Sequence, residues 1–315
     1  MTSYLVRRIG TAVMVIVALS FIAFGMVRLI PGDPAMVYLN VNDPSPEALA
    51  QIRSELGLDR SWFVQYWDWM SGILTGDLGS SLTRPYEIGE QLATRLPASL
   101  QLAVCAMIVA VALGVPAGVI AAVRSGRPAD AAIRGTSFVL LAIPAFVIGT
   151  VVILVNSMTL KLPLVGYVPL SEGVFRSIAS IAVPVVVLAL SMGSMLARYT
   201  RNTVIDALAQ DYVRTARAKG ASSTRIVIRH TLRNGLIPVV TIIGVQLGAL
   251  IGGTIVVENV FAIPGMGSML VESINSTDYP VIQTCVLVLG AIYVTINLAV
   301  DLLYPLIDPR IRAVS

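Results

Sequence analysis

Charged residues are scarce in this sequence. They make up 13% of its 315 residues, whereas soluble proteins contain about 25%. Hydrophobic residues account for 56% of the chain, and the mean hydropathy is +0.82. This balance excludes an ordinary water-soluble globular protein, and we expect a chain that lies within a lipid bilayer.

Cysteine and histidine are also rare, with two cysteines and one histidine in the whole chain. Cys105 and Cys285 both lie inside apolar runs, where a cysteine usually serves as a small packing group, so we expect no disulfide. His230 stands in a basic segment with no cysteine or second histidine near it. No metal site is therefore expected.

Motifs for nucleotide binding and catalysis are missing. The sequence contains no Gly-Lys-Ser or Gly-Lys-Thr, the triplet that ends a phosphate loop. The apolar runs hold no paired carboxylates and no nucleophile beside a base. We therefore expect a protein that is not an enzyme and that binds no cofactor itself.

Six charge-free runs dominate what is present. Each is near the roughly 20 residues that a helix needs to cross the hydrocarbon core, and none shows the alternation of barrel strands. The runs are Ile9–Val27, Leu96–Val123, Gly135–Leu160, Ser177–Ala197, Asn234–Val257 and Tyr279–Val300. They predict an all-α integral membrane protein with six transmembrane helices. Pro116, Pro144 and Pro184 fall inside three runs, where they indicate kinks or are simply packed by neighbouring helices.

The charge-free character of these runs also bears on function. Ion-driven carriers usually place ionisable groups near the membrane midplane, and none of the six runs contains one. Ion coupling within this chain is therefore not expected, and active transport would need an external source of energy. A passive channel, a structural membrane subunit and a secondary carrier remain as alternatives.

The basic residues predict the orientation. The first run follows Arg7 and Arg8, is too long for a typical signal peptide and has no small-x-small cleavage site, so it is expected to remain as a first span within residues 1–30. Most basic residues fall in the segments on one side of the membrane. Under the positive-inside rule these segments and both termini face the cytoplasm.

Residues 31–95 form a predicted extracytoplasmic domain between the first two spans, with nine acidic residues against four arginines. Ser45 and Pro46 indicate the start of a helix that ends before Gly57, and a second helix is expected over 61–74. The second helix is rich in aromatic residues, namely Trp62, Phe63, Tyr66, Trp67 and Trp69. They favour a position at the membrane interface, with a partner surface as the alternative.

The rest of the chain, residues 96–315, is the predicted transmembrane core, which includes a basic cytoplasmic loop over 198–233. Within it, 210–220 predicts a short docking helix with Tyr212, Val213 and Ala216 on one face and a left-handed cap at Gly220. The candidate contact residues are Asp206, Leu208, Asp211, Tyr212, Val213, Arg214, Thr215, Ala216, Arg217, Lys219 and Gly220. Positive-inside topology alone, or a polybasic patch that binds lipid, would also explain the charges. The interspersed apolar residues favour a protein interface.

An apolar loop over 258–280 predicts an outer gate. Pro264, Gly265 and Gly267 force a turn, while Phe261 and Met266 make it more apolar than an ordinary exposed loop. A re-entrant segment at the outer mouth of a pathway fits both properties, and the alternative is a loop that lies flat on the outer surface. Glu258, Phe261, Pro264, Gly265, Met266 and Gly267 are the candidate gate residues.

Three blocks of the sequence resemble the dipeptide, oligopeptide and nickel permease family of ABC importers. They are 76–100, 211–240 and 252–283. In ABC importer permeases generally, a Glu-Ala-Ala triplet stands six to four residues before the glycine that ends the coupling helix. Here Arg214, Thr215 and Ala216 hold those positions before Gly220. The segment thus departs from the general pattern and is similar to the peptide-type variant.

The resemblance implies a fold like that of type I ABC importer permeases, in the cytoplasmic (inner) membrane of a bacterium. It implies four partners besides the lipid bilayer: a second permease, two ATPase subunits that hold ATP and Mg²⁺, and an extracytoplasmic substrate-binding protein. No nucleic acid is expected as a partner. Peptides are the expected cargo, and nickel chelates, glutathione and haem remain open because one scaffold serves several cargoes.

Overall fold

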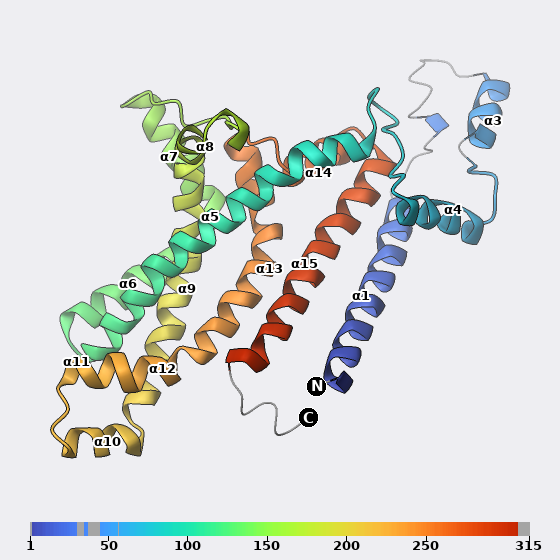
Figure 1. Ribbon diagram of the computed structural model, residues 1–315. Helices are drawn as coiled ribbons and strands as arrows, with labels where there is room; N and C mark the ends of the chain where they lie inside the picture. The colour runs from blue at the N-terminus through green and yellow to red at the C-terminus, as the bar shows by residue number, and fades with distance from the viewer. Residues whose placement is uncertain (1, 30–34, 37–44, 56, 308–315) are drawn as a thin grey trace.

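The structure, a computed structural model, describes residues 2–29, 35–36, 45–55 and 57–307 (Figure 1). The regular secondary structure of this part of the chain is helical, with one isolated bridge between Ser80 and Glu87. The helices are α1 (Thr2–Leu29), α3 (Pro46–Glu55), α4 (Trp62–Thr75), α5 (Ile88–Val123), α6 (Pro128–Ala142), α7 (Ala145–Met158), η1 (Leu170–Glu172), α8 (Val174–Ser180), α9 (Ala182–Leu208), α10 (Asp211–Ala218), α11 (Ser223–Arg225), η2 (Ile226–Thr231), α12 (Leu232–Gly235), α13 (Ile237–Val260), α14 (Met266–Asn275) and α15 (Tyr279–Ile307).

The expected all-helical membrane fold is confirmed. Five described helices are long and apolar enough to cross a bilayer, namely those that contain 6–26, 88–123, 182–208, 238–260 and 279–302. The consecutive helices α6 and α7 give a sixth span if they are counted together. The helices extend beyond the charge-free runs at several ends.

The third predicted span is broken. Helices α6 and α7 meet at 92°, so 135–160 is not one continuous helix. The break lies at Ile143, whose φ of −98° and ψ of 121° are extended, because a residue before proline is pushed out of the helical region. Pro144 then begins the next helix instead of kinking a continuous one.

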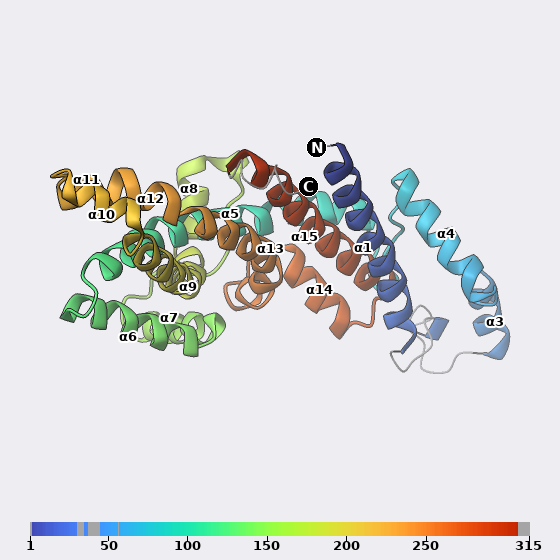
Figure 2. The same ribbon diagram turned by 90° about the horizontal axis from the view of Figure 1, so that it is seen from below.

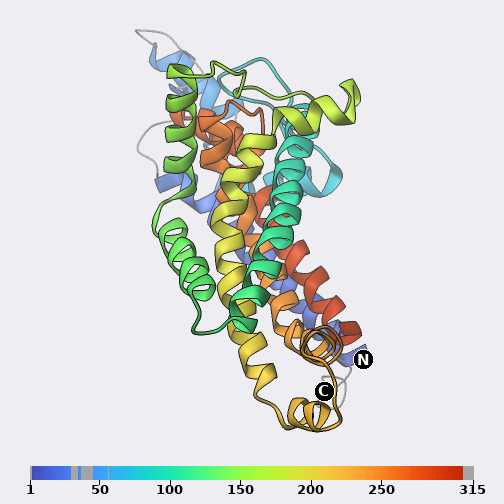
Figure 3. The same ribbon diagram turned by 90° about the vertical axis from the view of Figure 1, so that its left-hand side faces the viewer.

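The fourth predicted span also has different limits. A separate short helix, α8, ends at Ser180, and α9 starts at Ala182, so Pro184 lies in the first turn of α9 and not inside a kinked span. At its other end α9 continues past the charge-free run as far as Leu208. Figure 3 shows this long helix, in yellow, beside α5, in turquoise. By contrast, α5 accommodates Pro116 within one helix.

Small residues allow α5 and α9 to pack closely at the centre of the fold. A Cβ atom added to Gly114 would lie 2.9 Å from Gly193 Cα, and one added to Gly118 would lie 2.6 Å from Thr200 Cβ. Gly114 and Gly118 are four residues apart on α5, as are Gly193 and Ala197 on α9. This is the small-xxx-small spacing that brings membrane helices together.

The main apolar core surrounds this helix pair. It contains Leu102 and Met107 of α5, Val187 of α9, and Leu250 and Val257 of α13. Cys105 borders this core, Cys285 lies in a neighbouring cluster, and both are free thiols, which confirms the expected packing role.

The aromatic residues of α4 divide between two environments. Tyr66 stacks on Phe21 of α1 at 4.1 Å between ring centroids, and Trp62 meets Phe24 edge-on at 5.5 Å. Trp67, on the other side of α4, is exposed. The inner aromatics thus hold the helix against the first span, while the outer ones remain available for lipid or a partner.

Two ends of the bundle can be distinguished in Figure 1. Helices α10, α11 and α12 lie at one end, together with the start of α1 and the end of α15, and α3, α4, α8 and α14 lie at the other. In Figure 2, α1 lies beside α15, where Arg8 Nη1 and Asp301 Oδ2 form an ion pair at 3.3 Å. The candidate docking segment and the candidate gate therefore lie at opposite ends.

Candidate functional site

The candidate docking helix is α10, and its two faces differ. Val213 is fully buried and Ala216 nearly so, in a cluster with Ile226 of η2. Tyr212, in contrast, is 37% exposed. The prediction that Tyr212, Val213 and Ala216 share one contact face is wrong, because η2 folds back beneath α10 and covers the latter two.

The outward surface of α10 is charged and polar around the Tyr212 ring. Arg214 pairs with Asp211 at 3.5 Å, and both side chains remain largely in solvent. The exposed candidates are Asp206, Asp211, Tyr212, Arg214, Thr215, Arg217, Lys219 and Gly220, while Leu208 is half-buried. One aromatic side chain within a charged rim is the arrangement of a protein contact surface.

Gly220 ends α10 in the predicted left-handed conformation, with φ of +78°. The amide of Gly220 donates to the carbonyl of Arg217 at 2.9 Å, and that of Ala221 donates to Ala216 at 3.1 Å. These two bonds form a Schellman motif, which requires positive φ at the glycine. The motif turns the chain so that η2 can lie under α10.

Replacing Gly220 with valine should loosen this turn. A Cβ atom here would meet nothing within 4 Å, so the penalty of about 1–2 kcal/mol arises from backbone strain and not from a clash. Asparagine tolerates the left-handed region, so Gly220→Asn should be milder. Limited proteolysis of the purified variants measures the difference, and equal cleavage of both would contradict the assignment.

The loop is fixed to the membrane helices on its other side. Gly235 of α12 packs against α9, where an added Cβ would lie 3.4 Å from the Ala207 side chain and 3.7 Å from Val204 Cα. Helix α12, which follows η2, is therefore held against α9.

Glu258 organises the candidate gate at the opposite end. Its carboxylate is fully buried and accepts a hydrogen bond from Ser99 Oγ of α5 at 2.7 Å. It also accepts from the amides of Gly267 and Ser268, at 2.7 and 3.1 Å. A negative charge at a helix N-terminus is stabilised by the unpaired amides and the helix dipole. Glu258 thus joins the ends of α13 and α14 to α5.

The two glycines of the gate segment allow this close approach. A Cβ atom on Gly265 would lie 2.5 Å from the Glu258 carboxyl carbon and 2.5 Å from Ser99 Oγ. A Cβ on Gly267 would overlap the backbone of Ile255 and lie 2.8 Å from Glu258 Oε2. Neither site has room for a side chain.

The remaining gate candidates are mostly internal. Phe261 is fully buried next to Gly149 of α7, and Met266 is fully buried among residues of α5 and α15. Pro264 is exposed. The apolar gate candidates Phe261 and Met266 are thus covered by protein. Helix α14 forms a corner where α5 and α15 begin (Figure 1).

A second buried carboxylate, Asp278, fastens the same corner. It accepts hydrogen bonds from Ser81 Oγ, from Thr83 Oγ1 at 2.9 Å and from the Leu82 amide at 3.2 Å. These donors lie just before α5. Burial, reinforced by the Asp278 carboxylate, raises the pKa of Tyr86, so this phenol stays neutral beside the hydrogen bonds to Asp278.

Sequence reasoning missed this polar network. It treated the fifth span as free of ionisable groups because the run stops at Val257, yet α13 continues through the buried Glu258. Ser99 and Asp278 were not singled out at all. Two signals were available. Glu258 is an acidic residue directly after the run that ends at Val257, and Ser99 is a small hydroxyl residue near the start of the run that begins at Leu96.

Comparisons with known proteins cover nearly the whole chain. Residues 114–313 match the family described as "Binding-protein-dependent transport system inner membrane component", and residues 1–103 match the corresponding N-terminal family. The dipeptide transport system permease protein DppB of Escherichia coli K12 is 35% identical, with 99% of each chain covered. The glutathione transport system permease protein GsiC of Salmonella choleraesuis is 39% identical over 99% of each.

Among solved structures, the MetNI methionine ABC transporter in inward-facing conformations gives a TM-score of 0.57 at 18% identity. The match covers 69% of this chain and 96% of the other. It supports the helical architecture of the core. With the family matches over both parts of the sequence, it follows that this chain belongs to the inner membrane components of binding-protein-dependent transport systems.

Proposed function

We propose that this chain is the translocation subunit of an ATP-driven importer of di- or oligopeptides. The observation that carries the proposal is α10, a helix with an exposed Tyr212 in a charged rim on a loop fixed to two spans. Because the sequence lacks a phosphate loop, energy would enter through this surface. The names of the relatives, which include dipeptide and glutathione permeases, favour peptides as cargo.

The proposed assembly contains a second permease, two ATPase subunits that bind ATP and Mg²⁺, and an extracytoplasmic binding protein. The six spans would supply half of the pathway. Both termini and α10 would face the cytoplasm, in line with the basic residues near α10 and at the α5–α6 turn. The binding protein would then dock at the end that carries α14.

The test is peptide-stimulated ATP hydrolysis by the reconstituted complex, with Tyr212→Ala as the key variant. A buried aromatic at an interface typically contributes about 2 kcal/mol, so association with the ATPases should weaken about thirtyfold and stimulation should be lost. Since Tyr212 packs outside the buried cluster of the loop, the membrane part should remain folded.

Tyr212→Phe is the matched control because it retains the ring and removes the hydroxyl. It should keep ATPase binding and uptake close to wild type. Normal transport by a fully expressed Tyr212→Ala protein would contradict docking at this residue. Stimulation by nickel chelates or haem, but not by peptides, would leave docking intact and overturn the cargo assignment.

We further propose that the corner around Glu258 acts as the outer gate. The buried residues of the corner are covered by protein, so they do not face a pathway in this arrangement. Gating would therefore involve movement of the corner as one unit. Glu258, Phe261, Gly265, Met266 and Gly267 would hold that unit together, with Pro264 at its exposed tip.

A further inference from the structure

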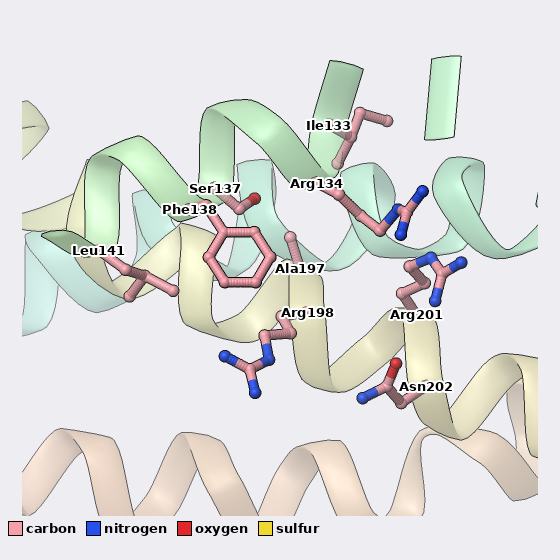
Figure 4. Close-up of a pocket in the computed structure, with 9 residues that line it drawn as sticks. All are labelled: Ile133, Arg134, Ser137, Phe138, Leu141, Ala197, Arg198, Arg201 and Asn202. Carbon is pink, nitrogen blue, oxygen red and sulfur yellow. The ribbon is translucent and has the colours of Figure 1, made fainter. Parts of the chain in front are cut away.

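A basic groove between α6 and α9 is not accounted for by the proposed transport function. It has a volume of about 110 Å³, and its lining includes Arg134, Phe138, Leu141, Arg198, Arg201 and Asn202. A second hollow of about 310 Å³ adjoins it and shares Leu141, Arg198 and Asn202. Figure 4 shows Arg134, Arg201 and Asn202 toward one end of the groove and Leu141 toward the other.

The groove carries more positive charge than its own carboxylate can neutralise. Buried Asp130 accepts from Arg201 Nε at 2.6 Å and from Arg201 Nη2 at 2.9 Å. Arg134 also reaches Asp130, at 3.3 Å, but remains half exposed. Among the described residues Arg198 makes no ion pair. Arg134 and Arg201 thus share one buried carboxylate, and Arg198 adds a third guanidinium group to the groove, which leaves positive charge for an anion.

Aromatic contact holds Arg198 in place. Its guanidinium carbon lies 5.8 Å from the centre of the Phe138 ring, within the range of a cation–π interaction. Figure 4 shows the ring and this guanidinium group together at the groove. An arginine fixed in this way keeps its donors free for a phosphate, which it can bind through two parallel hydrogen bonds.

Apolar surface continues from the arginines toward the middle of the membrane. Arg134 and Arg198 border the charge-free runs that begin at Gly135 and end at Ala197, so both lie at the same membrane interface. Beyond them on α6, Phe138 is 63% exposed and Val139 is 58% exposed. A basic end followed by an apolar track matches a phospholipid, with its headgroup at the interface and its acyl chain along the helix.

We propose that this groove binds an anionic phospholipid, with the phosphate held by Arg134 and Arg198 and an acyl chain along Phe138 and Leu141. The site lies between two spans and is separate from α10. It would fix the broken α6–α7 span against α9 and make the complex depend on acidic lipid. A free anion or the carboxylate of a cargo peptide would use the same arginines, and competition with the lipid distinguishes each of them from it.

The test uses the full-length chain, delipidated in detergent and titrated in native mass spectrometry. The probes are dioleoyl phosphatidylglycerol, dioleoyl phosphatidylcholine, glycerol 3-phosphate and trialanine. The first phosphatidylglycerol molecule to bind should bind more tightly than the first phosphatidylcholine molecule. Arg198→Gln and Arg134→Gln should each weaken it about fivefold, the equivalent of about 1 kcal/mol per basic residue.

Arg127→Gln is the matched control, because Arg127 is exposed at the same membrane face and lies outside the groove. This substitution should leave the affinity for the first bound phosphatidylglycerol molecule unchanged. Equal binding of both lipids, or equal loss in all three variants, would overturn the site. Displacement of the lipid by glycerol 3-phosphate would assign the groove to a free anion, and displacement by trialanine would assign it to cargo. Either result contradicts the proposal.

Discussion

Replacing Gly114 with valine should separate α5 from α9 and destabilise the whole membrane core. An added Cβ would overlap the carbonyl oxygen of Gly193 and lie 2.9 Å from Gly193 Cα. Both are backbone atoms, so no rotamer change can relieve the contact. Overpacking of a tight core typically costs about 1–3 kcal/mol, and a backbone obstacle places this variant at the upper end. Thermal unfolding of the purified protein in detergent measures the loss.

Gly252→Val provides the matched control. Gly252 also lies in a membrane helix, α13, but an added Cβ there meets nothing within 4 Å. Both substitutions introduce the same β-branched side chain, so differences in helix propensity cancel. If the two variants unfold at the same temperature, close packing of α5 on α9 is not what stabilises the core.

The spans were predictable because the bilayer imposes one simple rule. A helix that crosses hydrocarbon needs a long apolar run, and the runs placed at α1, α5 and α15 each lie within one described helix. The run over 234–257 begins in α12 and continues through α13 after a break at Leu236. The ends of helices follow a weaker rule, because a helix leaving the membrane can continue into water. Helix α9 does so as far as Leu208, and hydropathy alone does not show where it stops.

Local conformational signals were partly sufficient. Gly220 was predicted in the left-handed region because few other residues adopt it readily, and its φ is positive. Pro144 indicated a kink, but its position in the sequence does not predict the 92° angle between α6 and α7. The burial of Val213 depends on Ile226 of η2, a π-helix that no pattern in this segment indicates.

Networks between distant residues were beyond sequence reasoning. Ser99 and Glu258 are 159 positions apart, and no pattern in either segment indicates that they meet. The small-xxx-small spacing of Gly114 and Gly118 was readable in the apolar run, but its partner, Gly193 with Ala197, could be identified only from the structure.

Substitution of Glu258 by leucine should release α14 from α5 and abolish uptake. The leucine side chain has a similar size but accepts no hydrogen bond, so the amides of Gly267 and Ser268 and the hydroxyl of Ser99 lose their buried partner. Each unsatisfied buried donor costs about 1–3 kcal/mol. With three such donors the loss should be at least about 3 kcal/mol, measured by thermal unfolding, with uptake of labelled peptide falling to background.

Glu258→Gln separates the hydrogen bonds from the charge. Its amide oxygen can still accept from Gly267 and Ser268, and its amide group can donate to Ser99 Oγ, which has a second lone pair after accepting from the Met266 amide at 2.8 Å. The variant should remain folded, because its losses are limited to two. The interaction of the charge with the start of α14 contributes about 0.3–1 kcal/mol, and the Ser99 hydroxyl loses the one hydrogen bond that it donates, because an amide nitrogen cannot accept it. If Glu258→Gln is as damaging as Glu258→Leu, the charge itself is essential, and this carboxylate does more than hold the ends of α13, α14 and α5 together.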